Sequence, residues 1–310
     1  MNEALPPCGD RQEEENMEKT KVYLVATGDR SAGADRCLRY IGVPDYTGKT
    51  VFVKPNFNTA DPAPGSTHND TLEELLSAVR AANPARIIMG ERSGPAITEE
   101  VYEKKGLKVL CDKYDVEWLN FETMPPEGWV NFDRPDLHWP GGFMIPKAIT
   151  EADAIVATCC LKTHGFGGVF SNSLKLAVGL VPEDFDLLHG SPHMRKMIAE
   201  INLVYTPEFI LSDAVEVFVD GGPMEGVRNK ANIMLISKDR IALDAVGLAL
   251  LKHLGSNDAI MNTPIFKQEQ IARAVELGLG VSSPDEIQIV TDDAASAGIT
   301  ASLEEILGQG

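Results

Sequence analysis

The sequence predicts an α/β protein with a mainly parallel, doubly wound sheet. Two observations lead to this class. Between residues 22 and 290, apolar runs of strand length alternate with segments that have helical periodicity. The chain of 310 residues is long enough to bury a full core, and its 44% hydrophobic and 24% charged residues are typical of globular proteins. Alternating strands and helices build parallel sheets that carry helices on both faces.

Eight apolar runs have the length and boundaries of strands. They cover residues 22–26, 51–53, 86–89, 116–120, 154–161, 209–211, 233–236 and 287–290. Helical periodicity is present in residues 71–82, 98–106, 169–181, 192–204, 241–254 and 264–277. In the first of these, Leu72, Leu75, Leu76 and Val79 share one helix face.

Two segments break the alternation. Residues 123–146 are rich in Pro, Gly, Trp and Asp, which predicts an irregular excursion from the sheet and a candidate lid. Residues 1–19 form an acidic tail that we expect to be disordered. No convincing linker divides the rest, so residues 20–310 are predicted to form one domain.

The net charge and the composition of the chain limit the kinds of partner and cofactor that we expect. A formal net charge of −18 repels phosphate backbones, which argues against nucleic acid. No apolar run approaches the roughly 20 residues of a membrane span, and the polar N-terminus does not resemble a signal peptide. We therefore expect a cytoplasmic protein. The five cysteines lack the spacing of a metal or cluster site, so no intrinsic iron–sulfur cluster is predicted. A homo-oligomer is compatible with the sequence.

Polar residues follow the predicted strands where a parallel sheet binds its ligands. Lys54 and Asn56 follow residues 51–53, and Lys162 and His164 follow residues 154–161. Residues two apart in an extended chain share a face, so each pair points to one side. The loop after Asn56 continues to His68. Because ligands bind beyond the carboxyl ends of parallel strands, we expect a shared site there.

These residue types suggest roles in catalysis. The two lysines suit a carboxylate or phosphate, and His164 suits general acid–base chemistry. His68 is a second base or a metal ligand. The alternative for Lys54 or Lys162 alone is a solvated strand end. The predicted catalytic set is thus Lys54, His68, Lys162 and His164.

Further residues are candidates for binding a cofactor or a metal. The glycine loop before the predicted helix 169–181 resembles an anion cradle, since free amides at a helix N-terminus attract anions; a plain tight turn is the alternative. The predicted cofactor contacts are Asn56, Ser93, Gly165, Gly167, Gly168, Ser173 and Lys175. Oxygen and imidazole ligands for a divalent metal are available in His68, His164, Asp213 and Glu216.

Four motifs, in this order and spacing, resemble the domain of unknown function 362 family. They are Lys54-Pro55-Asn56 with Thr67-His68; Leu161-Lys162-Thr163-His164 with Ser173-Leu174-Lys175 and Gly179; Ser212-Asp213-Ala214 with residues 221–226; and residues 239–246. The resemblance implies iron–sulfur-linked metabolism, because many members carry a ferredoxin-like cysteine segment. This chain lacks that segment, so a redox role would need a separate ferredoxin-type partner or a bound cofactor. Leu176 also stands where the family motif has Asn.

Two functions from different classes remain open at this point, besides the alternative of a structural protein with a vestigial cleft. The first is an enzyme that acts on a small anionic metabolite or cofactor, by isomerisation or racemisation through proton transfer or by redox chemistry. The second is a protein that binds or delivers a metal or metallo-cofactor without turnover. A more distant likeness to the nickel-pincer lactate racemase group lies in the kinds of residues and not in aligned motifs.

Overall fold

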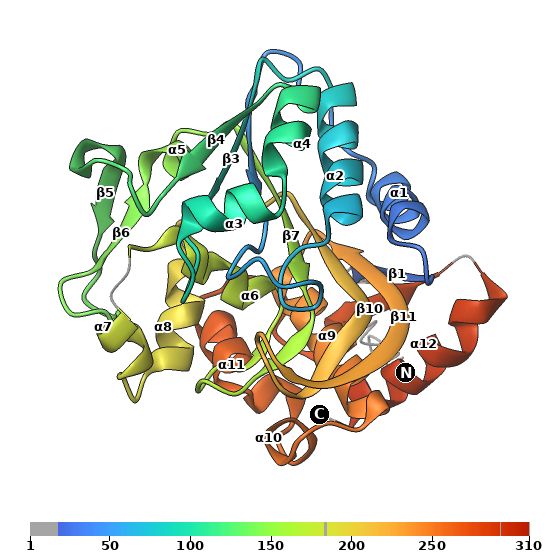
Figure 1. The fold of residues 1–310 in the computed structure, drawn as a ribbon. Coiled ribbons are helices and arrows are strands. Elements are labelled where there is room, and N and C mark those ends of the chain that lie inside the picture. The colour runs from blue at the N-terminus through green and yellow to red at the C-terminus, as the bar shows by residue number, and fades with distance from the viewer. Residues whose placement is uncertain (1–17, 183–184, 292, 310) are drawn as a thin grey trace, which may run out of the picture.

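The computed structural model describes residues 18–182, 185–291 and 293–309, and its centre is an eight-stranded sheet (Figure 1). The spatial order is β12 (Ile287–Val290), β1 (Thr20–Ala26), β11 (Gly226–Ser237), β10 (Phe209–Gly221), β7 (Ala154–Cys160), β2 (Thr50–Lys54), β3 (Arg86–Glu91) and β4 (Val116–Asn120). Only β11 runs antiparallel to its neighbours, and the remaining strand pairs are parallel. The predicted fold class is confirmed.

Helices cover both faces of the sheet. One face packs on α1 (Arg30–Ile41), α2 (Asn69–Ala81), α3 (Thr98–Lys104) and α4 (Leu107–Tyr114), which lie together in Figure 1. The other face packs on α6 (Ser173–Leu176), α8 (Met194–Ile201), α9 (Arg240–Leu254), α11 (Glu269–Glu276) and α12 (Ala294–Gly308). The short helices α7 (Phe185–His189) and α10 (Asp258–Met261) add the buried side chains of Leu188 and Ile260 to the core on this second face. None of the described helices is long and apolar enough to cross a membrane.

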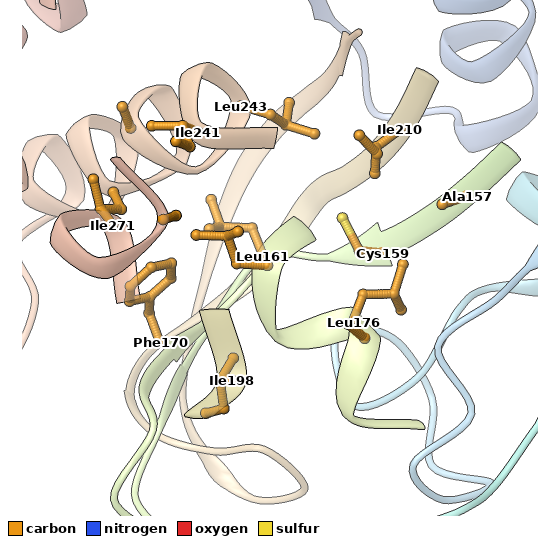
Figure 2. Close-up of a cluster of buried hydrophobic side chains, with 14 of the residues drawn as sticks. Ala157, Cys159, Leu161, Phe170, Leu176, Ile198, Ile210, Ile241, Leu243 and Ile271 are labelled. Carbon is orange, nitrogen blue, oxygen red and sulfur yellow. The ribbon is translucent and has the colours of Figure 1, made fainter. Parts of the chain in front are cut away.

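The larger core cluster fixes the elements that carry the site. Figure 2 shows side chains from β7, β10, α6, α8, α9 and α11 meeting around Leu161. Leu161 and Leu243 are fully buried, and burying such a side chain stabilises the fold by about 1.5–3 kcal/mol. Helix α9 is buried from Arg240 to Leu251, and this stretch is apolar apart from Arg240 and Asp244, as expected for a central helix. The segment after β7 is therefore held rigidly.

The order of the strands creates a switch point between β2 and β7. From β2 the chain moves outward through β3 to β4, and it then returns to place β7 on the other side of β2. Ligands of open α/β sheets bind where the strand order reverses in this way. Lys54 ends β2 and Lys162 follows β7, so both lie at this point.

Two strands differ from the prediction, β10 in its length and β11 in its direction. Strand β10 is much longer than predicted, so Asp213 and Glu216 lie within it and not after it. Strand β11 is antiparallel, which puts Asp239 at the opposite edge of the sheet, where its carboxylate caps α9 by accepting from Ala242 N. Asp213 pairs with Cys160 of β7 and so lies at the same edge as Lys162, but its carboxylate is taken by Arg30, and Asp239 lies at the opposite edge.

The predicted helix over residues 169–181 begins too early, and residues 173–180 are helical. Residues Val169–Ser171 form strand β9, which pairs with β8 (Lys162–His164). The helix begins only at Ser173, as the single turn α6, and continues as the 3₁₀-helix Ala177–Leu180.

The excursion leaves the main sheet as predicted and forms a small unit of its own. The 3₁₀-helix Pro126–Gly128 leads into β5 (Trp129–Phe132), which pairs with β6 (Phe143–Pro146) ahead of α5 (Lys147–Thr150). The Glu200 carboxylate of α8 accepts from the backbone N–H of His138 and lies 2.6 Å from its Nδ1, which anchors the excursion. The predicted tail, residues 1–19, falls almost wholly outside the described residues.

Candidate active site

A cavity of about 170 Å³ lies at the carboxyl ends of β2, β3 and β7. Cavities of about 150 Å³ hold benzene-sized molecules, so this one has room for a small metabolite. Its polar lining is Asn56, Asn58, Glu91, Arg92, Cys160, Lys162, His164, Ser171, Asn172, Lys175 and His189, and its apolar lining includes Pro95, Trp139, Phe166, Leu176, Val178, Val181, Leu188 and Met224.

Lys54 is fully buried, is not part of the cavity lining, and is already paired. Its Nζ donates to the Glu91 carboxylate over 2.7 Å and to the Pro55 carbonyl over 2.6 Å. Glu91 also accepts from Phe57 N and Arg92 N. Burial lowers the pKa of Lys54 and raises that of Glu91, and each partner opposes the change in the other. The pair joins the ends of β2 and β3.

Lys162 lines the cavity and holds a neighbouring loop. Its Nζ donates to the carbonyls of Pro64 and Gly65 over 2.7 and 2.6 Å. An ammonium has three donors, so one N–H remains for a ligand. Burial lowers the pKa of Lys162, while nearby Cys160 and Asp213 partly offset that effect. These two hydrogen bonds tie residues 64 and 65 to the start of β8.

Lys175, on the single helical turn α6, differs from Lys54 and Lys162 in the surroundings of its amine. Its half-buried side chain lines the cavity, and no described residue forms a hydrogen bond or ion pair with its amine. Burial, together with the charges of Lys162 and Arg92, lowers its pKa to about 7. The amine is therefore poised between its charged and neutral forms near neutral pH.

His164 is buried beside Lys175. Burial and the charges of Lys175 and Lys162 lower its pKa well below the ordinary value, so the imidazole is neutral at pH 7. Its Nδ1 is enclosed and has no hydrogen-bond partner in the described part of the chain. Lys162 and His164 both line the cavity, as their spacing of two in β8 predicts.

The glycine loop is the turn of a β-hairpin and not the start of a helix. Residues 165–168 connect β8 to β9, which corrects the expected cradle at a helix N-terminus. A Cβ on Gly168 would lie 2.8 Å from Lys175 Cε and 3.0 Å from His164 Nδ1. Gly168 thus leaves the space in which these two side chains approach each other. Gly165 N donates to Gly222 O, and Arg195 donates to Gly167 O, so other segments hold the loop.

Short helix α6 is positioned by helix α9. The buried Asp244 carboxylate accepts from the backbone N–H groups of Ser173 and Leu174. Burial raises the pKa of Asp244 to about 7, and these two hydrogen bonds oppose the rise. The Ser173 hydroxyl donates to the Arg240 carbonyl. Ser173 therefore helps to position Lys175, and its hydroxyl is hydrogen-bonded to α9 and not directed to a ligand.

The four predicted metal ligands are not brought together. His68 Nδ1 accepts from Asp70 N and caps α2, and its side chain is 37% exposed. Asp213 is buried against Arg30, 2.7 Å from its Nε, and Glu216 is opposite Lys230 in the β10–β11 ladder. Within residues 18–182, 185–291 and 293–309, no three His, Cys, Asp or Glu side chains are grouped to hold a metal ion.

Of the predicted cofactor contacts, Asn56 and Lys175 line the cavity. The Ser93 hydroxyl is instead buried and donates to Phe57 O. With Lys162 and His164, four of the predicted site residues therefore share one cavity.

The family model described as Domain of unknown function (DUF362) matches residues 51–249, which is more than half of the chain. The chain belongs to the DUF362 family. The match confirms the resemblance that the motifs suggest, and it contains Lys54, Lys162, His164 and Lys175.

Two solved structures are similar to parts of this DUF362 protein. The lactate racemase apoprotein from Thermoanaerobacterium thermosaccharolyticum is 17% identical, with a TM-score of 0.44 over 64% of this chain and 51% of that one. A structure of ornithine delta-aminotransferase from Plasmodium falciparum, described in terms of redox regulation, is 11% identical, with a TM-score of 0.17 over 94% of this chain and 50% of that one. The chain spans about half the length of each. No curated protein matches it.

Several cavity residues of this DUF362 protein were not predicted from its sequence. Glu91 is the last residue of β3 and Arg92 follows it, and both line the cavity. Trp139 reaches the cavity from the excursion and donates its indole N–H to Met197 O. Met224 arrives on the tip of the β10–β11 hairpin. The available sequence signal for Glu91 and Arg92 is a carboxylate and an arginine at the end of a buried strand.

Proposed function

We propose that this protein is an enzyme that binds a small organic anion in the cavity and catalyses proton transfer on it. The observation that carries the proposal is the pairing of Lys175 with His164. Lys175 is unpartnered among the described residues and has a pKa of about 7, and the neutral His164 lies beside it. Groups whose pKa lies near the working pH are the most effective general acids and bases.

The charges of the cavity favour an anion. Arg92, Lys162 and Lys175 line it, and the carboxylate of Glu91 is neutralised by Lys54. The protein as a whole carries a formal charge of −18, so the cavity differs from the rest of the molecule in gathering positive charges. A cleft lined by one sign of charge focuses the field and raises the local concentration of a ligand of opposite sign.

The apolar lining limits the kind of anion. Trp139, Phe166, Leu176 and Leu188 supply a large part of the wall. A cavity with apolar walls and a few convergent polar groups is the usual form of a metabolite site. We therefore expect a compact molecule with an acidic head group and a short carbon skeleton.

Metal delivery without turnover receives less support. The carboxylate of Asp213 is committed to Arg30, and His68 caps a helix. His164 alone of the four predicted ligands lines the cavity. One imidazole does not make the three- or four-ligand set of an ordinary protein metal site.

The proposal is tested with acetate, succinate, malate and phosphate as ligands. Calorimetry should detect binding of at least one of them, and Lys175→Met should weaken it about tenfold to a hundredfold, the effect of losing one hydrogen bond to a charged group. Lys238→Met is the control, because Lys238 is exposed at the opposite edge of the sheet. Equal affinity in both variants would place the anion elsewhere.

Catalysis is tested separately by NMR in deuterated water. The bound acid should exchange a carbon-bound hydrogen for deuterium in the wild type, and His164→Gln should slow this exchange about a hundredfold or more. Binding without any exchange would indicate a binding protein and contradict the enzymatic part of the proposal.

A further inference from the structure

The lysines near the cavity differ in what their amines already bind. Lys54 is engaged by a carboxylate and a carbonyl, and Lys162 by two carbonyls. Lys175 has no such partner in the parts of the chain that the structure describes, and its side chain lines the cavity. Its amine is thus the one most open to a covalent reaction with a ligand.

The surroundings of Lys175 favour the neutral amine. Its aliphatic chain is half-buried, and the charges of Lys162 and Arg92 disfavour a third positive charge. Only the neutral amine has the lone pair that attacks carbon. Lysines that are desolvated or lie beside another cation are those that react with carbonyl compounds.

A proton carrier is in place beside this amine. The position of a Cβ on Gly168 lies within about 3 Å of both Lys175 Cε and His164 Nδ1, so the imidazole and the lysine flank one glycine. Forming an imine requires that nitrogen lose protons and that oxygen gain them. A neutral imidazole can accept a proton from one atom and return it to the other.

We propose that Lys175 forms a Schiff base with the carbonyl carbon of a small 2-oxo acid whose carboxylate is held by Lys162, with the positive charge of Arg92 nearby. The inference rests on the proposed function and names its class of substrate. The nitrogen lone pair forms the C–N bond while the carbonyl π pair moves to oxygen. His164 carries protons from nitrogen to that oxygen, which leaves as water as the C=N bond forms. Amine and ketone give imine and water, with no oxidant or reductant.

The imine would explain why a proton-transfer site contains such a lysine. A protonated imine withdraws electrons from the neighbouring carbon and makes its C–H bond more acidic. The same cavity would then bind the anion, activate it and exchange its proton. The apolar walls around Leu176 and Trp139 would exclude water that hydrolyses the imine.

The test traps the imine in the full-length protein. Pyruvate, 2-oxobutyrate and 2-oxoglutarate are each added near pH 7 with sodium cyanoborohydride, which reduces an imine to a stable secondary amine, and peptides are analysed by mass spectrometry. Lys175 should be the principal labelled lysine, because ordinary lysines, with a pKa of about 10.4, are protonated there. Lys238→Met should label like the wild type.

A conservative variant separates charge from reactivity. Lys175→Arg keeps the positive charge but cannot form an imine, so it should still bind a 2-oxo acid by calorimetry and lose all labelling at this site. Labelling of Lys162, or labelling spread over the surface, would overturn the inference. Binding of a 2-oxo acid without any adduct, or binding only of anions that lack a ketone, would overturn it and leave the proposed function standing. If no anion binds in the cavity, both are wrong.

Discussion

Replacing Lys175 by methionine should change how the stability of the protein depends on pH. Methionine has a similar length and no charge, so the substitution removes the titrating amine and little volume. In the folded state the pKa of Lys175 is about 7, against an ordinary value of 10.5. Between these values the unfolded chain binds a proton that the folded protein has released, so the free energy of unfolding rises with pH.

The size of this effect follows from the two pKa values. Each pH unit between them is worth about 1.4 kcal/mol, so below pH 7 the charged amine costs the folded state at most about 5 kcal/mol. Lys175→Met should therefore be more stable than the wild type at about pH 6, and the advantage should shrink steadily towards about pH 10.

Urea unfolding followed by circular dichroism measures the difference at each pH. Titrating groups that do not interact with Lys175, such as Glu73 and Asp293, are present in both proteins and cancel in the comparison. Lys238→Met serves as the control and should differ little from the wild type at neutral pH. A difference between Lys175→Met and the wild type that stays constant across the range would refute the assigned pKa and its cause.

Three further outcomes follow from the contacts of the site. Glu91→Gln leaves the buried Lys54 amine without its counter-charge and should lower the free energy of unfolding by about 3–5 kcal/mol in urea; a change below about 1 kcal/mol would mean that the pair is unimportant. Gly168→Ala places a methyl group 2.8 Å from Lys175 Cε, so calorimetry should show weaker anion binding with near-normal unfolding. Asp213→Asn should destabilise the fold and leave the metal content of the purified protein unchanged; loss of a bound metal would restore the metal-site hypothesis.

Local patterns were sufficient for most of the sheet. The strand over residues 116–120 was predicted with its observed bounds, because its apolar run is short and clearly delimited. The spacing of two residues between Lys162 and His164 likewise predicts that both side chains lie on one side of an extended segment, and both line the cavity. Helices α1 and α12 were missed, since both are rich in small residues and lack a wide apolar stripe.

Other features depend on tertiary contacts that no local pattern reveals. The segment after Gly168 looked helical, but it pairs with β8 instead and Val169 has a φ of 66°. The predicted run for strand β10 ends too early because Ser212 and Asp213 interrupt its apolar residues. In the fold, the Ser212 hydroxyl donates a hydrogen bond to Asn172, and the Asp213 carboxylate pairs with Arg30.

The same limit applies to the chemistry of the site. Lys54 was expected to contact the ligand, yet the neighbouring strand β3 supplies Glu91 to neutralise it. Sequence alone cannot show which lysine is left unpaired. The strand order and the burial of Lys175 were needed to identify it.

The most direct test of the central claim is a crystal structure of the protein soaked with its tightest-binding small acid. We predict density for that acid in the cavity between β2 and β7, with its acidic group beside Lys162 and Arg92 and its reacting carbon beside Lys175. Density for the acid at another site, with this cavity empty, would contradict the account.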